Sequence, residues 1–250
     1  MLDLMVKDGV AWLTLQRPEV LNAINRGLAN ALRLRIEELQ NRSDVRVVVT
    51  RGAGKAFCAG SDLRELAPLS APEAAVYELE FAEIFAKLDE LPYPTIAMVH
   101  GYALGGGLGL ALYHDFRIAA TVASLGMPEV ELGWIPPWAV GRLAETVGVA
   151  QARWLLMTCQ LLTGAQAADI GLVNEAVPQD QLSSRVEELA IRLASMPTEG
   201  LSSTKAFLRR MSPLRNLEYD VRASESFRDC FAKPAAQERV RNFLARKTKR

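Results

Sequence analysis

The spacing of hydrophobic residues near the N-terminus predicts a β-hairpin followed by an amphipathic helix. Apolar and polar residues alternate over residues 4–15, and Asp8-Gly9 supplies a turn sequence typical of hairpins. Apolar side chains then recur at helical intervals, so we expect a helix over about residues 26–41. The apolar positions of this helix are Leu28, Leu32, Ile36 and Leu39.

A buried strand, a capped helix and another strand are expected next. Residues 45–50 form a short apolar run that leads into a glycine-containing turn. Ser70 and Glu73 have the spacing of a capping box, and Pro92 and Pro94 end the helix that this box begins. The apolar positions of the helix are Tyr77, Phe81, Ile84, Phe85 and Leu88. Residues 95–99 then predict the next strand.

The pattern as a whole indicates an α/β fold with a helical C-terminal region. Strand, glycine-rich turn and helix recur over residues 95–113, and a strand is expected at 116–120. After Pro178 the signals are helical, over 180–195, 198–211 and 215–247. We therefore expect a core at 1–180 and a helical region at 181–250.

Composition and charge narrow the functional classes. The 250 residues are 50% hydrophobic and 23% charged, which is typical of a folded globular chain. Lys plus Arg and Asp plus Glu both number 29, so no net charge attracts the chain to nucleic acid or to an anionic membrane. A basic cluster at the C-terminus is interpreted as a frayed, solvated end: Arg246, Lys247, Lys249 and Arg250.

Cysteine content and the N-terminal sequence predict a soluble cytoplasmic protein. Cys58, Cys159 and Cys230 are odd in number and have no paired spacing, which indicates reduced thiols. No targeting segment is recognisable, and charges or glycines interrupt every apolar stretch before membrane-spanning length. The two histidines lack the Cys or Glu spacing of a metal site.

Two glycine-containing segments carry the candidate chemistry. They are FCAGSDLREL (57–66) and GYALGGGLGLALYHD (101–115). The glycine triple 105–107 stands between a predicted strand and a helix, where unpaired N–H groups favour a phosphate or an oxygen that becomes anionic during reaction. Neither phosphate-loop pattern fits, because Leu110 and Val49 stand where glycines are required.

Together with other motifs, these segments resemble the crotonase, or enoyl-CoA hydratase/isomerase, family. The resemblance extends over nearly the whole chain and includes RPEVLNAI (17–24), MPEVELGWIPPW (127–138), LTGAQAADIGLVNEAVP (162–178) and ERVRNFLARK (238–247). It implies a spiral of ββα repeats, with C-terminal helices that build trimers, often paired into hexamers. It also implies an acyl-CoA substrate, with CoA entering as part of the substrate and no separate cofactor.

The same resemblance assigns the binding residues. The thioester oxygen is expected between two backbone N–H groups, those of Ser61 and Gly106. The stretch from Ala59 to Arg64 resembles the segment that lies along CoA, and the expected contacts are Ala59, Ser61, Asp62, Leu63, Arg64 and Gly106. Loss of one oxyanion donor costs about 2.7–4 kcal/mol of barrier in other enzymes, so these two donors are expected to dominate catalysis.

Glu129 matches the family's second catalytic glutamate, whereas the place of the other glutamate is occupied by Gly109. One carboxylate suffices to move a proton between carbons, so we expect an isomerase with Glu129 as the proton shuttle. Glu131 is expected to face solvent. The glycine is expected to enlarge the pocket, and an acid from the preceding helix, such as Glu80 or Glu83, could stand in for the missing carboxylate.

Alternatives stay open. Within the family, they are hydration, dehydration or other enolate chemistry on an unusual acyl-CoA; the dienoyl isomerase variant lacks its further acid, because Pro137 stands there. The alternative from another class is an RNA-binding or non-catalytic member of the family. An affinity for RNA that falls steeply with salt would support it. Trp134 and Trp138 either line the acyl pocket or pack beneath it. His100, His114, Asp115 and Cys58 are interpreted as structural residues.

Overall fold

A mostly parallel sheet forms the centre of the chain. The computed structural model describes residues 1–212 and 217–247 of the 250-residue chain. The larger sheet has the strand order β1 (Leu2–Lys7), β2 (Val10–Leu15), β3 (Val47–Gly52), β4 (Thr95–Val99), β6 (Phe116–Ala120) and β9 (Glu175–Val177). β1 and β2 are antiparallel, and every later pair is parallel. The predicted hairpin is confirmed, with Asp8 and Gly9 at φ 51° and 76°, the left-handed values that such a turn requires.

A smaller sheet stands beside the larger one and positions the glycine-rich segments. It has the order β5 (Tyr102–Leu104), β7 (Ser124–Gly126) and β8 (Leu162–Thr163). β5 and β7 are parallel, and β8 is antiparallel to β7. These strands are two or three residues long, and neither they nor β9 was predicted from the sequence. Runs this short carry no usable periodicity.

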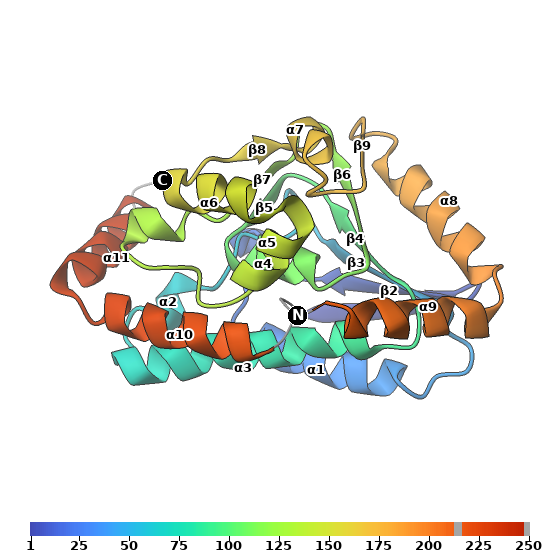
Figure 1. Cartoon of the computed structure of the whole chain (residues 1–250), viewed down its shortest axis with the longest axis horizontal. Coiled ribbons are helices and arrows are strands. Elements are labelled where there is room, and N and C mark those ends of the chain that lie inside the picture. The colour runs from blue at the N-terminus through green and yellow to red at the C-terminus, as the bar shows by residue number, and fades with distance from the viewer. Residues whose placement is uncertain (213–216, 248–250) are drawn as a thin grey trace.

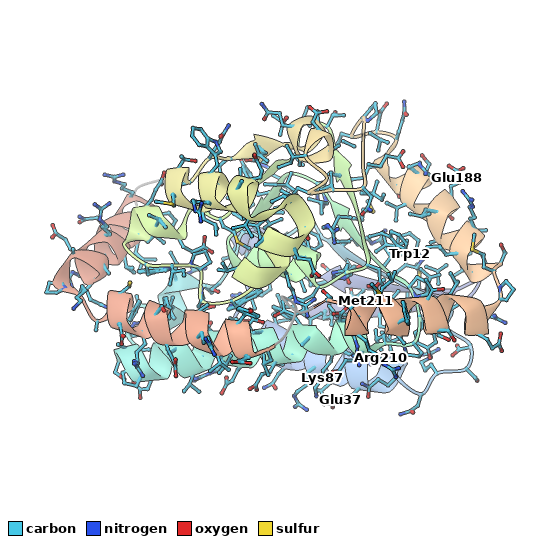
Figure 2. The ribbon with its side chains drawn as sticks, in the orientation of Figure 1. Trp12, Glu37, Lys87, Glu188, Arg210 and Met211 are labelled. Atoms are coloured by element: carbon cyan, nitrogen blue, oxygen red, sulfur yellow. The ribbon has the colours of Figure 1, made fainter. Side chains whose placement is uncertain are left out.

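Helices cover both sides of the sheets (Figure 1). The predicted helices at 26–41 and after Ser70 are confirmed as α1 (Arg26–Leu39) and α3 (Ala71–Glu90), and the Ser70–Glu73 capping box is formed. Lys87 Nζ of α3 donates a hydrogen bond to Glu37 Oε1 of α1 at 2.9 Å (Figure 2 labels both residues). The others in this part of the chain are η1 (Pro18–Val20), α2 (Leu63–Leu66), α4 (Gly106–Leu112), η2 (Glu129–Leu132), α5 (Val140–Val147), α6 (Val149–Thr158) and α7 (Gly164–Asp169).

The C-terminal region is helical, as predicted, but divides differently. Its helices are α8 (Leu182–Ala194), α9 (Thr198–Arg210), α10 (Leu217–Phe231) and α11 (Pro234–Lys247). The prediction of a single helix over 215–247 is wrong. The chain turns at Ala232-Lys233, and a new helix begins at Pro234, which has no N–H to continue the previous one. Residues 215 and 216, Lys249 and Arg250 lie outside the described residues.

These helices lie against different parts of the core. α8 contacts β2, β3, β4 and β6, and α10 runs along α3 (Figure 1). α11 lies at the opposite end of the molecule from α8 and α9, where it contacts η2 and α2 (Figure 1). Cys58, Cys159 and Cys230 are unpaired. Within residues 1–212 and 217–247, no helix combines the length and hydrophobicity that crossing a membrane requires.

Candidate active site

Backbone hydrogen bonds hold the two glycine-containing segments against each other. The N–H of Cys58 donates to the carbonyl of Tyr102 at 2.9 Å, and the N–H of Leu104 returns a bond to the Cys58 carbonyl at 3.1 Å. A Cβ on Gly107 would stand 2.1 Å from the Cys58 carbonyl oxygen, so the first turn of α4 can approach this segment only with glycine at that position. The two segments therefore meet as one backbone surface.

The N–H groups of Ser61 and Gly106 lie on this surface. Gly60, at φ 98°, turns the chain just before Ser61, and a Cβ on Gly60 would stand 3.4 Å from the Gly106 nitrogen. Gly106 is the first residue of α4. In the described structure neither N–H donates a hydrogen bond to another residue. Two unused donors this close together can both bind one incoming oxygen.

A cavity of about 350 Å³ opens beside these donors. Ser61, Gly106 and Gly109 line it, together with both tryptophans whose position the sequence left open. Its remaining walls are largely apolar, including Leu66, Leu104, Met127, Leu132 and Pro137, with Phe243 contributed by α11. No Lys, Arg or His lines it within the described residues. The site therefore excludes charge except for its carboxyl groups, which are Glu78, Glu129 and Glu131.

Glu129 is buried against the glycine triple. It begins η2 and is 9% exposed, and a Cβ on Gly105 would stand 2.9 Å from its Oε1. Its Oε2 is buried and has no hydrogen-bond partner in the described structure. Burial, with a smaller contribution from the charge of Glu78, raises the pKa of Glu129 from 4.5 to about 8. Glu131, two residues later, is exposed as predicted. Glu129 is thus a carboxyl group poised for proton transfer.

A second carboxyl group, which sequence analysis missed, enters the cavity from α3. Glu78 is 2% exposed, and its Oε2 accepts hydrogen bonds from Trp138 Nε1 at 2.8 Å and Ser61 Oγ at 3.0 Å. Burial raises its pKa to about 7. The expectation that Glu80 or Glu83 of this helix replaces the missing carboxylate is wrong, because both side chains lie on its exposed face. The available signal was the helical period, which places Glu78 in the apolar stripe between Ala74 and Phe81.

Trp138 fills the space beside Gly109. A Cβ on Gly109 would stand 2.4 Å from Cζ3 of the ring, and further ring atoms lie at 2.9 and 3.0 Å. The expectation that this glycine enlarges the pocket is therefore wrong: the volume that a longer side chain at 109 would take is occupied by the indole. Trp138 itself is 2% exposed.

Neighbouring aromatic and acidic residues fix the position of Trp138. Its ring packs against Phe85 and Tyr113 at centroid distances of 5.5 and 6.1 Å. Asp220 of α10 accepts a hydrogen bond from the N–H of Ala139 and another from the Tyr113 hydroxyl, both at 2.8 Å. Trp134 packs separately, against Phe227 and Phe231. The C-terminal helix α10 thereby holds a wall of the site.

A second hollow adjoins the cavity and contains the expected CoA-contacting segment. Ala59, Ser61, Asp62, Leu63 and Arg64 all line it, and Phe243 and Leu244 of α11 face them. The Asp62 carboxylate caps α2 and pairs with Arg17 at 3.0 Å, an interaction that lowers its pKa against the effect of burial. The Arg64 Nε pairs with Asp62 at 3.3 Å, but the side chain is 63% exposed, so the rest of its guanidinium group can meet an anionic ligand.

The remaining candidates are structural, as expected. Burial raises the pKa of the Cys58 thiol to about 12, and burial lowers that of His114 to about 3. Asp115 accepts a hydrogen bond from the Thr95 N–H at 2.7 Å and pairs with Lys205 at 2.8 Å. His100 lies 3.0 Å from the carbonyl of Gly54 and does not line the cavity. In the described part of the chain, no group of three or more His, Cys, Asp or Glu residues could hold a metal ion.

The chain is similar to known enoyl-CoA hydratases and isomerases over most of its length. A family model described as enoyl-CoA hydratase/isomerase matches residues 5–249. The short-chain-enoyl-CoA hydratase of Clostridium acetobutylicum is 32% identical over 98% of this chain and 95% of its own length. An enoyl-CoA isomerase/hydratase of Mycosarcoma maydis is 37% identical over 78% of this chain and 74% of its own length. The crystal structure of an enoyl-CoA hydratase from Mycobacterium smegmatis superposes with a TM-score of 0.88 at 29% identity, covering 99% of this chain and 89% of that one.

Proposed function

The chain belongs to the enoyl-CoA hydratase/isomerase family, has the α/β crotonase fold and is an acyl-CoA enzyme of that type, and on this premise we propose that it moves a double bond within an enoyl-CoA. Glu129 removes a proton from the α carbon of a 3-enoyl-CoA. The electron pair moves onto the thioester oxygen, which the N–H groups of Ser61 and Gly106 stabilise. Return of a proton to the γ carbon yields the 2-enoyl-CoA.

The observation that carries this proposal is the environment of Glu129. A buried carboxyl oxygen without a hydrogen-bond partner, in an apolar cavity beside two free N–H donors, is suited to exchanging protons with carbon. Its pKa of about 8 makes it a stronger base than an exposed glutamate. The adjoining hollow, with the exposed Arg64 guanidinium, is suited to the CoA portion.

Isomerisation is preferred to hydration because of Trp138. The resemblance places a second glutamate of the family's hydratases at Gly109, and two facing carboxyl groups suit the addition of water. Here the indole occupies that space. Hydration is the second candidate, because Glu78 offers another carboxyl group in the same cavity and several relatives are named hydratases.

The deciding experiment is an assay of the purified protein against 3-enoyl-CoA and 2-enoyl-CoA substrates of several chain lengths. We expect isomerisation to exceed hydration for the same acyl group. Hydration that exceeds isomerisation across the panel, and that survives Glu129→Gln, would overturn the proposal.

We further propose that the protein is a cytoplasmic homotrimer or homohexamer. Leu208 of α9 and Met211, which follows that helix, are 59% and 64% exposed (Figure 2 shows Met211 near the end of α9). With Leu201 and Phe116 they line a surface hollow that also has charged residues in its walls. Large exposed apolar side chains such as these, surrounded by polar residues, are typical of a subunit contact.

A further inference from the structure

Glu78 is a buried carboxyl group with only one of its oxygens engaged. Its Oε2 accepts both hydrogen bonds, from Trp138 Nε1 and Ser61 Oγ, at 2.8 and 3.0 Å. Within the described residues Oε1 accepts none, although Glu78 lines the cavity. The engaged oxygen fixes the carboxyl group, and the other is left for a molecule in the cavity.

A purely structural role would not require a carboxyl group here. The amide oxygen of a glutamine could accept the same two hydrogen bonds, without the cost of burying an ionisable group that has no cationic partner. The titratable groups that line the cavity with it are Glu129 and Glu131 from η2 and Tyr102 from β5. On its own helix, Tyr77 lies beside it and donates a hydrogen bond to Glu65 of α2. None of these neighbours supplies a positive charge.

Glu78 and Glu129 are held beside adjacent residues of the glycine triple. Glu129 lies against Gly105, 2.9 Å from the position of a Cβ there. The two groups that hold Glu78 lie against Gly106: a Cβ at that residue would stand 3.0 Å from the Trp138 ring and 3.3 Å from Ser61 Oγ. An acyl chain whose thioester oxygen meets Gly106 therefore enters a cavity that both carboxyl groups line.

We propose that Glu78 is the second proton carrier of the site, delivering a proton to the γ carbon while Glu129 removes one from the α carbon. The inference rests on the proposed isomerisation. The Glu129 carboxylate takes the α proton, and the C–H electron pair forms the dienolate. The dienolate then takes the proton of the Glu78 carboxyl group: the γ C–H bond forms, the Cβ–Cγ double bond becomes Cα–Cβ, and the thioester carbonyl is restored. A proton returns from Glu129 to Glu78 through solvent, which completes the cycle.

Burial raises the pKa of Glu78 to about 7 and that of Glu129 to about 8, so both groups exchange protons near neutral pH, and the reactive form, with the proton on Glu78, is the minor of the two singly protonated forms. The two carboxyl groups titrate as a pair, and the active form carries one proton between them. We therefore expect a bell-shaped dependence of kcat on pH. A single shuttle needs only an ionised Glu129, and its rate would rise with pH to a plateau.

The test compares Glu78→Gln with Glu83→Gln, a control on the exposed face of the same helix. Glu78→Gln should lower kcat for isomerisation by about 10²-fold, with little change in KM, and should abolish the basic limb of the pH profile. It should slow exchange of the α proton of a saturated acyl-CoA in deuterated water far less, because that exchange needs no γ proton. Glu83→Gln should match the natural protein throughout.

A second measurement follows the proton itself. With a 3-enoyl-CoA deuterated at the α carbon, a single shuttle carries label to the γ carbon, whereas two carriers leave the γ position filled from solvent. We expect negligible transfer in the natural protein. Trp138→Phe keeps a ring but removes one hydrogen bond to Glu78, and should move the basic limb to higher pH; it serves if Glu78→Gln does not fold.

The inference and the proposed function fail separately. Substantial label transfer, or unchanged kcat and pH limbs in Glu78→Gln, would overturn the role of Glu78 while leaving isomerisation intact. If the natural protein exchanges the α proton but does not isomerise, the proposed function fails, and with it the γ-proton step assigned to Glu78.

Discussion

The ring of Trp138 lies 2.4 Å from the point where a Cβ on Gly109 would stand, and the indole N–H donates to Glu78 at 2.8 Å. One side chain thus closes the space beside α4 and holds a carboxyl group that comes from α3. The cavity thus receives a carboxyl group from α3, and none from α4, the helix that begins at the glycine triple.

Introducing a side chain at 109 should destabilise the fold. Gly109→Ala places a Cβ into the buried Trp138 ring, and overpacking of this kind costs about 1–3 kcal/mol. Gly200→Ala is the matched control, since it is also helical and a Cβ there meets nothing within 4 Å. Urea denaturation should show a lower free energy of unfolding for Gly109→Ala and no such decrease for Gly200→Ala. Equal stability of the two variants would mean that Trp138 moves freely, contrary to its burial.

The N–H of Gly106 should be essential, and the Ser61 hydroxyl should not. Gly106→Pro removes the donor at the first position of α4, where proline is compatible with a helix. Gly106→Ala is its control, because it adds a Cβ but keeps the N–H. We expect kcat of the proline variant to lie about 10²–10³-fold below that of the alanine variant.

Ser61→Ala keeps the backbone N–H and should stay active. Because it removes a hydrogen bond that stabilises ionised Glu78, it should also raise the pKa of that carboxyl group. An inactive but folded Ser61→Ala protein, judged by circular dichroism, would assign the hydroxyl a direct role.

Glu129→Gln should lower isomerisation by about 10²–10⁴-fold, the usual contribution of general acid–base catalysis. Glu131→Gln, two residues along the same 3₁₀ helix and exposed, should retain activity. Steady-state assays of both variants on one 3-enoyl-CoA suffice. Comparable losses in the two would remove the special role of Glu129.

The same substitution should stabilise the protein at alkaline pH. The pKa of Glu129 rises from 4.5 to about 8 on folding, so the folded state binds this proton more tightly than the unfolded state does. Stability is therefore lost as pH rises from about 4.5 to about 8. Glutamine at 129 does not ionise, so Glu129→Gln avoids this loss. At pH 9 its free energy of unfolding should exceed that of the natural protein by at least about 1 kcal/mol, which corresponds to about 2–4 °C in Tm. The advantage should vanish near pH 4; thermal melts at both values check it.

Sedimentation at micromolar concentration should show a trimer or hexamer. Leu208→Glu places a charge at an exposed apolar position of α9 and should dissociate the assembly. Ala206→Glu, exposed on the other side of that helix, should not. A natural protein that sediments as a monomer would refute the proposed assembly.

The sequence by itself determined the parts of the fold and the site that depend on local order. The Asp8-Gly9 hairpin, the capped helix α3 and the strand at 95–99 follow from turn chemistry and from periods of two or 3.6 residues. Ser61, Gly106 and Glu129 were found because their motifs are contiguous, and the structure brings all three to one cavity.

Only the tertiary structure decided how the site is filled. The short strands β5, β7 and β8 are specified by their partners, because two or three residues carry too little periodicity to be recognised alone. Glu78 and Trp138 are 60 residues apart, and their hydrogen bond exists because α3 and the turn before α5 meet in the core. The volume beside Gly109 likewise depends on a ring 29 positions later in the chain. Such contacts are set by long-range packing in three dimensions, and no local pattern of one sequence encodes them.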